Sequence, residues 1–335
     1  MWHNVKKQTL SSEARLAKIE RDKEKIHSYN KLKDEIFKIR NEGSHTVEFL
    51  NKLTDLLGLN PEFYTIWNIR RETLSSLFHQ HQLDSQSTLE DELKFVMVLM
   101  KRYPKCYWIW NHRLWCLFQL GKDANWEFEL GIVSKLLSMD ERNFHGWQYR
   151  RVVIENLETH DDLENLKINL QEFKFTSSKV NSNISNFSAW HNRSKLIPKV
   201  YHLVGKLNYQ DEPLFQSKES LLLHELTLVN TGMYVDIDDS SIWVYLEWLL
   251  SDCFFIDELS NDKYHDILND QLKIINELND LEITDNGKDN CWCLKAMIII
   301  NELLDNRSAV RPLLEKLIDI DPLRRGRYID QLDSF

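Results

Sequence analysis

The sequence predicts an all-α fold, in which helical hairpins stack on one another to form a solenoid. Three observations predict this class. The 335 residues include only nine glycines and six prolines, so residues that break helices are rare. Hydrophobic residues make up 42% of the chain, which indicates a folded protein rather than a disordered one. A tryptophan-centred motif recurs along the chain, and such recurrence is typical of repeat proteins.

The recurring motif has three fixed positions. Its tryptophans are Trp67, Trp110, Trp147 and Trp190. An aromatic residue lies three positions before each one: Tyr64, Tyr107, Phe144 and Phe187. An arginine lies three positions after each one: Arg70, Arg113, Arg150 and Arg193. Two later copies, at Trp243 and Trp292, keep the tryptophan and lose the arginine.

The first predicted element is a long amphipathic helix over residues 13–40. Apolar residues such as Leu16, Ile19 and Ile26 recur there at helical spacing among mixed charges, and Gly43 follows the end of the pattern. For residues 46–335 we predict about six hairpin repeats. No shift in composition divides the chain, so we predict one helical-repeat domain over residues 1–335. We expect no additional domain of another type, such as an immunoglobulin-like or a leucine-rich domain.

Each repeat predicts a short turn followed by a helix that begins near the tryptophan. Residues three apart lie on nearly the same helix face, so tryptophan and arginine should both point into the seam between neighbouring hairpins. A buried guanidinium needs partners, and we expect turn carbonyls or a carboxylate of the adjacent hairpin. In the stretch PKCYWIWNHRLW, residues 104–115, we therefore interpret Tyr107, Trp110 and Arg113 as packing residues.

Candidate functional residues are those at which one copy of the motif departs from the others. Five positions before the tryptophan the second copy has Lys105, and two positions before it the third copy has His145. Both precede or begin the second helix of a hairpin, so both should emerge on one rim of the stack, where repeat proteins tend to bind. The alternatives are a solvated lysine and a histidine that only packs.

Several function classes are disfavoured by composition and motifs. A net charge of −10 argues against a nucleic-acid binder, and no apolar run is long enough to span a membrane. Five scattered cysteines without a secretory signal favour reduced thiols and a cytoplasmic location. We interpret Cys291 and Cys293 as ordinary buried cysteines. Phosphate-loop, zinc-protease and nucleophile-elbow motifs are missing from the sequence. We therefore predict a binding protein that lacks a complete set of catalytic residues of its own.

The motif resembles the repeat of protein prenyltransferase α subunits. The stretches that carry this resemblance include NPEFYTIWNIRRE, DERNFHGWQYRR, NFSAWHNRSKLIP and IDPLRRGRYIDQL. They are most similar to the type II branch of the family, which acts on Rab GTPases, in its compact fungal form. The resemblance implies a right-handed superhelix of hairpins around a β subunit that holds the catalytic zinc and the lipid cavity. The enzyme would be active only as this heterodimer.

The resemblance also implies a reaction and its partners. Geranylgeranyl would pass from geranylgeranyl diphosphate to C-terminal cysteines of Rab GTPases, which an escort protein presents. The alternatives are the α subunit shared by farnesyltransferase and the type I enzyme, and a noncatalytic helical adaptor.

The resemblance assigns roles to four positions. Lys105 and His145 would be catalytic residues, and Tyr107 and Asn143 would contact the diphosphate or the subunit interface. No metal site is expected in this chain, although His3 is a weak candidate for reaching the zinc of the β subunit.

Overall fold

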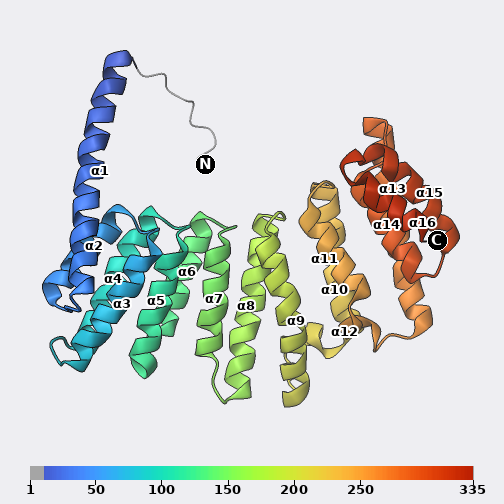
Figure 1. Ribbon diagram of the computed structural model, residues 1–335. Coiled ribbons are helices and arrows are strands. Elements are labelled where there is room, and N and C mark those ends of the chain that lie inside the picture. Colours follow the sequence, from blue (N-terminus) through green and yellow to red (C-terminus); the bar gives the residue numbers. More distant parts are fainter. Residues whose placement is uncertain (1–10, 335) are drawn as a thin grey trace. The chain divides into compact units, whose positions relative to one another are not determined.

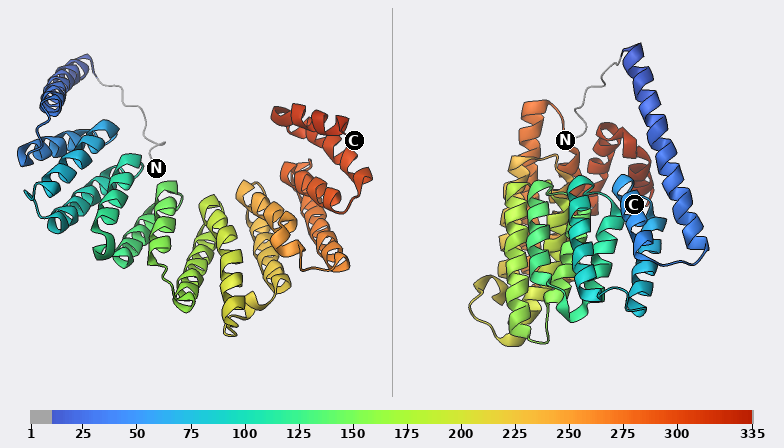
Figure 2. Two further views of the ribbon diagram at one scale, coloured as in Figure 1. Left: turned by 60° about the horizontal axis from the view of Figure 1, so that its bottom comes forward. Right: turned by 90° about the vertical axis from the view of Figure 1, so that its left-hand side faces the viewer.

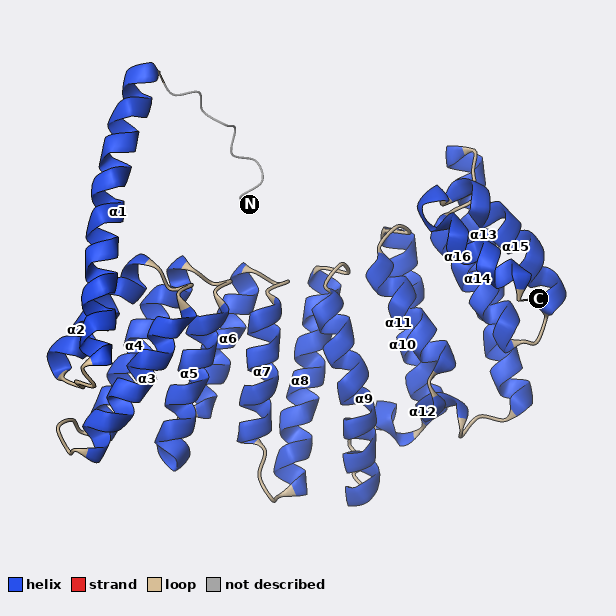
Figure 3. Cartoon of the chain, viewed as in Figure 1, coloured by secondary structure: helices blue, strands red, loops and turns tan. Residues whose placement is uncertain are grey.

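The computed structural model describes residues 11–334, and throughout this range the chain is built from helices and loops without a strand (Figure 3). The all-α class is therefore confirmed. The chain divides into two compact units, residues 1–129 and residues 130–335. Helix α6, Trp126–Met139, contains the boundary between them.

The first unit contains a long N-terminal helix and two hairpins. Its elements are α1 Ser12–Asn41, α2 Val47–Leu59, α3 Tyr64–His79, α4 Ser85–Arg102, α5 Tyr107–Leu120 and the short 3-10 helix η1 Gly121–Asp123. The C-terminal part of α1 packs on α2, where Ile36 is buried. Its N-terminal half extends past α2 and α3 (Figure 1), and the apolar Leu16, Ile19 and Ile26 are exposed there.

The second unit continues the pattern of antiparallel helix pairs, as the paired ribbons of α8 and α9 show (Figures 1 and 2). Its helices are α7 Phe144–Leu157, α8 Asp162–Ser182, α9 Phe187–Leu207, α10 Lys218–Val235, α11 Ser240–Ser251 and α12 Cys253–Ile256. They are followed by α13 Asn261–Asn286, α14 Cys291–Leu303, α15 Arg307–Ile320 and α16 Arg325–Asp333. The 3-10 helices η2 Pro213–Gln216 and η3 Pro322–Arg324 lie in loops.

The recurring tryptophans hold the turn of each hairpin. Trp67, Trp110, Trp147 and Trp190 are at most 4% exposed. Each indole N–H donates to the carbonyl six residues earlier, over 2.7 to 2.9 Å. Trp243 of the first weaker copy makes the same bond to Ile237 over 2.7 Å. One side chain thus fills the seam and satisfies a turn carbonyl, which explains why phenylalanine does not replace it.

The recurring arginines join consecutive hairpins through buried ion pairs. In every case the guanidinium donates two hydrogen bonds to one glutamate on the first helix of the next hairpin. The pairs are Arg70 with Glu92, Arg113 with Glu129, Arg150 with Glu172, and Arg193 with Glu225. The remaining donors reach backbone carbonyls or hydroxyls of the preceding helix, as from Arg113 to Leu93. The expected pairing with an adjacent carboxylate is confirmed.

In the first unit a buried histidine joins one of these arginine–glutamate pairs. His112 is fully buried between Trp67 and Trp115, and its Nε2 lies 2.9 Å from the carboxylate of Glu92. Burial lowers the pKa of His112 to about 4, against the opposing effect of Glu92. The hydrogen bonds that Glu92 accepts from His112 and Arg70, together with the charge of Arg70, outweigh its burial and lower its pKa to about 2.

We expect His112 to make the protein less stable in mild acid. Its pKa is lower in the folded than in the unfolded chain, so protons bind the unfolded chain more strongly between about pH 6.5 and pH 4. The free energy of unfolding should fall by about 2 kcal/mol from pH 7 to pH 5 through this group alone. Urea titrations at both pH values would measure it. His112→Asn, which copies Asn192 of a later repeat, should remove that part of the pH dependence, and an unchanged slope would contradict the assignment.

Candidate functional site

The aromatic residues three positions before each tryptophan lie at the surface rather than in the seam. Tyr64, Tyr107, Phe144 and Phe187 each begin a helix, and each is between 51% and 54% exposed. Tyr107 is therefore not buried in the seam with Trp110 and Arg113. These side chains give each hairpin an exposed aromatic group at the same end.

Lys105 lies in the turn between α4 and α5, two residues before Tyr107, and both side chains are exposed. Cys106 anchors this turn to the preceding one, because its buried thiol lies 3.3 Å from the carbonyl oxygen of Pro61. Burial raises the pKa of the Cys106 thiol to about 11. Trp108, beside it, packs on Tyr64 with ring centroids 5.2 Å apart. Lys105 thus emerges from a well-anchored turn in the first unit.

The equivalent turn of the second unit is organised by Asn143. Its side-chain oxygen accepts from the backbone N–H groups of His145 and Gly146 over 3.1 and 3.2 Å, so Asn143 caps the start of α7. His145 is only 5% exposed in this chain, and its ring lies 4.0 Å from that of Phe144, centroid to centroid. The structure therefore places Asn143 and His145 together, with a half-exposed aromatic ring above the histidine.

The described residues offer no metal centre of their own. Among residues 11–334, no three His, Cys, Asp or Glu side chains gather closely enough to hold a metal ion. His3 lies outside this range. Burial raises the pKa values of Cys291 and Cys293, the latter to about 12, so neither thiol is prepared to act as a thiolate. Within the same range no helix combines the length and apolar character that a membrane crossing requires.

The sequence interpretation overlooked two polar side chains that make buried or partly buried contacts. His112 joins the Arg70–Glu92 pair, and the spacing of histidines and glutamates gave no sign of that contact. Lys295 occupies the arginine position of the last copy, three residues after Trp292, and lies 3.1 Å from Asp321. A search for any cation at that position, rather than for arginine alone, could have identified it.

The fold and its repeats define a protein of the prenyltransferase α-subunit class. The family model "Protein prenyltransferase alpha subunit repeat" matches residues 89–120, 126–157 and 170–200. These segments contain α5, α7 and the first two thirds of α9, with their tryptophans and arginines. A solved structure described as Candida albicans protein geranylgeranyltransferase-I complexed with GGPP shares the fold, with a TM-score of 0.65 over 92% of this chain and 90% of that one. At 19% sequence identity this likeness concerns the fold alone.

Sequence relatives narrow the class. A Candida albicans protein described as geranylgeranyl transferase type-2 subunit alpha is 46% identical over 99% of this chain and 98% of its own length. A Saccharomyces cerevisiae protein of the same description is 36% identical, again over 99% of each chain. The chain therefore belongs to the family of geranylgeranyl transferase type-2 α subunits. The predicted family and its type II branch are confirmed.

Proposed function

We propose that this chain is the α subunit of a heterodimeric protein geranylgeranyltransferase that modifies Rab GTPases. The observation that carries the proposal is the match along nearly the full length of type-2 α subunits, together with an intact set of tryptophans and buried arginine–glutamate pairs. In the reaction the sulfur of a C-terminal cysteine bonds to C1 of geranylgeranyl diphosphate, the C1–O bond breaks, and diphosphate leaves. We also propose that the enzyme is cytoplasmic. The helical repeats of this chain would form a single domain.

Four residues of the two turns would serve this reaction. The ammonium of Lys105 would stabilise charge that develops on the departing diphosphate. Tyr107, exposed beside it, would donate a hydrogen bond to the same group or to the wall of the partner subunit. Asn143 would fix the start of α7, and His145 would contact the partner or the diphosphate from beneath Phe144. Phenylalanine at position 144 supplies no hydroxyl, so its contribution would be packing alone.

The β subunit would supply zinc, which lowers the pKa of the substrate thiol, and also the cavity for the lipid. Co-expression with a type-2 β subunit tests the assignment. We expect the two chains to co-purify in equal amounts, zinc to be bound by the heterodimer but not by this chain alone, and transfer to require both chains. Zinc bound one-to-one by the isolated chain, or pairing only with a farnesyltransferase or type I β subunit, would contradict it.

An escort protein would present the Rab substrate to the α subunit. A groove of about 380 Å³ between α10 and α13 is a candidate surface for this docking. There the side-chain oxygens of Asn230 and Gln271 are buried without a hydrogen-bond partner among the described residues. The charged residues that line the groove are two acids and one base, Asp270, Glu277 and Lys273. This surface suits a partner that offers amide or basic donors. In the co-purification experiment, Rab should then join the heterodimer only with the escort, and tight binding of free Rab would contradict this role.

A further inference from the structure

In the last copy of the repeat, Trp292 and the cation Lys295 are partly exposed, whereas their counterparts in the first four copies are buried. Trp292 is partly exposed, and its indole N–H makes no hydrogen bond within residues 11–334. The reason is local: six residues earlier lies Asn286, which is still in the last turn of α13 rather than in a hairpin turn. Lys295 is likewise only partly buried. Both side chains line a pocket of about 340 Å³.

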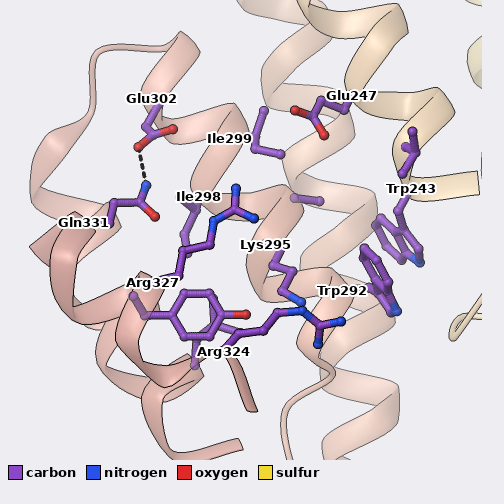
Figure 4. Close-up of a pocket in the computed structure, with 14 residues that line it drawn as sticks. Trp243, Glu247, Trp292, Lys295, Ile298, Ile299, Glu302, Arg324, Arg327 and Gln331 are labelled. Atoms are coloured by element: carbon purple, nitrogen blue, oxygen red, sulfur yellow. Dashed lines mark hydrogen bonds between the residues drawn. The ribbon is translucent and has the colours of Figure 1, made fainter. Parts of the chain in front are cut away.

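The pocket lies between α11, α14, α15 and α16 of the second unit (Figure 4). One side is aromatic and aliphatic, with Trp243, Trp292 and Ile299. Its size is at the lower end of ligand-binding pockets in proteins, so it can accept a few side chains but not a folded domain.

Positive charge gathers at one end of the pocket. Asp321 is a single carboxylate shared by Lys295 at 3.1 Å, Arg324 at 3.2 Å and the hydroxyl of Tyr328 at 2.6 Å. These contacts outweigh its burial and hold the pKa of Asp321 well below its ordinary value, so it remains ionised. One negative charge therefore faces two cations. The guanidinium of Arg327 extends into the same pocket and makes no ion pair within the described residues (Figure 4).

Negative charge lies at the other end. Glu247 and Glu302 line the pocket across from Arg324, and Glu302 accepts a hydrogen bond from Gln331 over 2.9 Å (Figure 4). A small dianion such as phosphate would therefore be attracted by Arg327 and repelled by the two glutamates. An occupant with a carboxylate at one end, an apolar middle and a donor at the other end complements all three surfaces.

We propose that this pocket binds a short peptide segment of a partner protein, in which one acidic side chain lies next to an apolar one. An acidic side chain of the segment pairs with Arg327 and Arg324, and a neighbouring aromatic or aliphatic side chain packs on Trp292 and Trp243. A basic side chain or backbone N–H groups of the segment then face Glu247 and Glu302. The inference does not depend on the enzymatic role proposed above, because it uses only groups of this chain.

The test uses the full chain labelled with 5-fluorotryptophan, in which Trp292→Phe identifies the resonance of Trp292. The probes are the blocked peptide Phe-Glu-Leu-Lys, its glutamine analogue Phe-Gln-Leu-Lys, and inorganic phosphate. We expect only the acidic peptide to shift the Trp292 resonance, with millimolar affinity. Arg327→Gln should weaken that binding roughly fivefold. Arg325→Gln, an exposed arginine of the same helix that does not line the pocket, should leave it unchanged.

Three results would overturn the proposal. They are equal binding of the acidic and glutamine peptides, an equal shift with phosphate, and no shift of Trp292 with the acidic peptide up to about 10 mM.

Discussion

Lys105→Ala should slow the single-turnover transfer of geranylgeranyl by roughly 10²-fold while leaving the heterodimer assembled. The departing diphosphate gains negative charge as the C1–O bond stretches, so a fixed cation stabilises the transition state more than the bound substrate. Lys105 suits this role because its turn is anchored by the indole of Trp110, which donates to Pro104 over 2.9 Å, and by the buried Cys106. Rapid-quench measurement with preloaded lipid isolates this step from product release.

Matched variants separate a role in chemistry from a role in folding. Lys105→Arg keeps the charge and should recover much of the rate. Lys101→Ala removes an exposed lysine from the last turn of α4 and should change neither rate nor assembly. All three variants should have the thermal stability of the natural chain, because Lys105 is exposed. If Lys105→Ala transfers lipid at the natural single-turnover rate, Lys105 is only a solvated surface residue.

The side of the helix on which each tryptophan and arginine lies could be predicted, because it depends only on their spacing within that helix. Both lie in one helix, three residues apart, and the helical period places them on one face whatever the neighbouring hairpin does. Their carboxylate partners could not be assigned in the same way. The glutamates follow their arginines by 22, 16, 22 and 32 residues, because the intervening loops and helices differ in length. Only the stacked structure identifies them.

The candidate site was predictable in its residues but not in their exposure. Comparison of the copies identified Lys105 and His145, since each departs from a common pattern. It predicted that both side chains emerge on one rim, and only Lys105 does: Lys105 precedes its helix and is exposed, whereas His145 lies in the first turn of α7 and is buried. The half-exposed position of Tyr107 was not predicted either. The excess positive charge of the last hairpin could not be predicted either. It arises because Lys295 and Arg324 share one carboxylate, Asp321, which follows α15 in the sequence.

Arg193→Ala should destabilise the chain by about 3 to 5 kcal/mol, and Arg113→Ala should act in the same direction. The Arg193 guanidinium donates to both oxygens of Glu225 over 2.6 and 2.7 Å, and Tyr245 donates to the same carboxylate over 2.8 Å. Arg193 and Glu225 are at most 1% exposed. The attraction of Glu225 outweighs burial and raises the pKa of Arg193 above its ordinary value. Alanine would leave a buried carboxylate without its counter-ion, next to a cavity.

The cost should come from the orphaned charge rather than from the loss of a net favourable ion pair. We therefore expect the triple variant Arg193→Met, Glu225→Leu, Tyr245→Phe to recover most of the lost free energy of unfolding in urea, since no buried polar group of the cluster is left unmatched. Lys263→Ala breaks an exposed ion pair with Glu219 in the same unit and should have little effect, because water already screens that pair. Equal losses in Arg193→Ala and Lys263→Ala would show that the buried pairs do not hold the hairpins together. A triple variant as unstable as Arg193→Ala would instead show that the ion pair itself stabilises the stack.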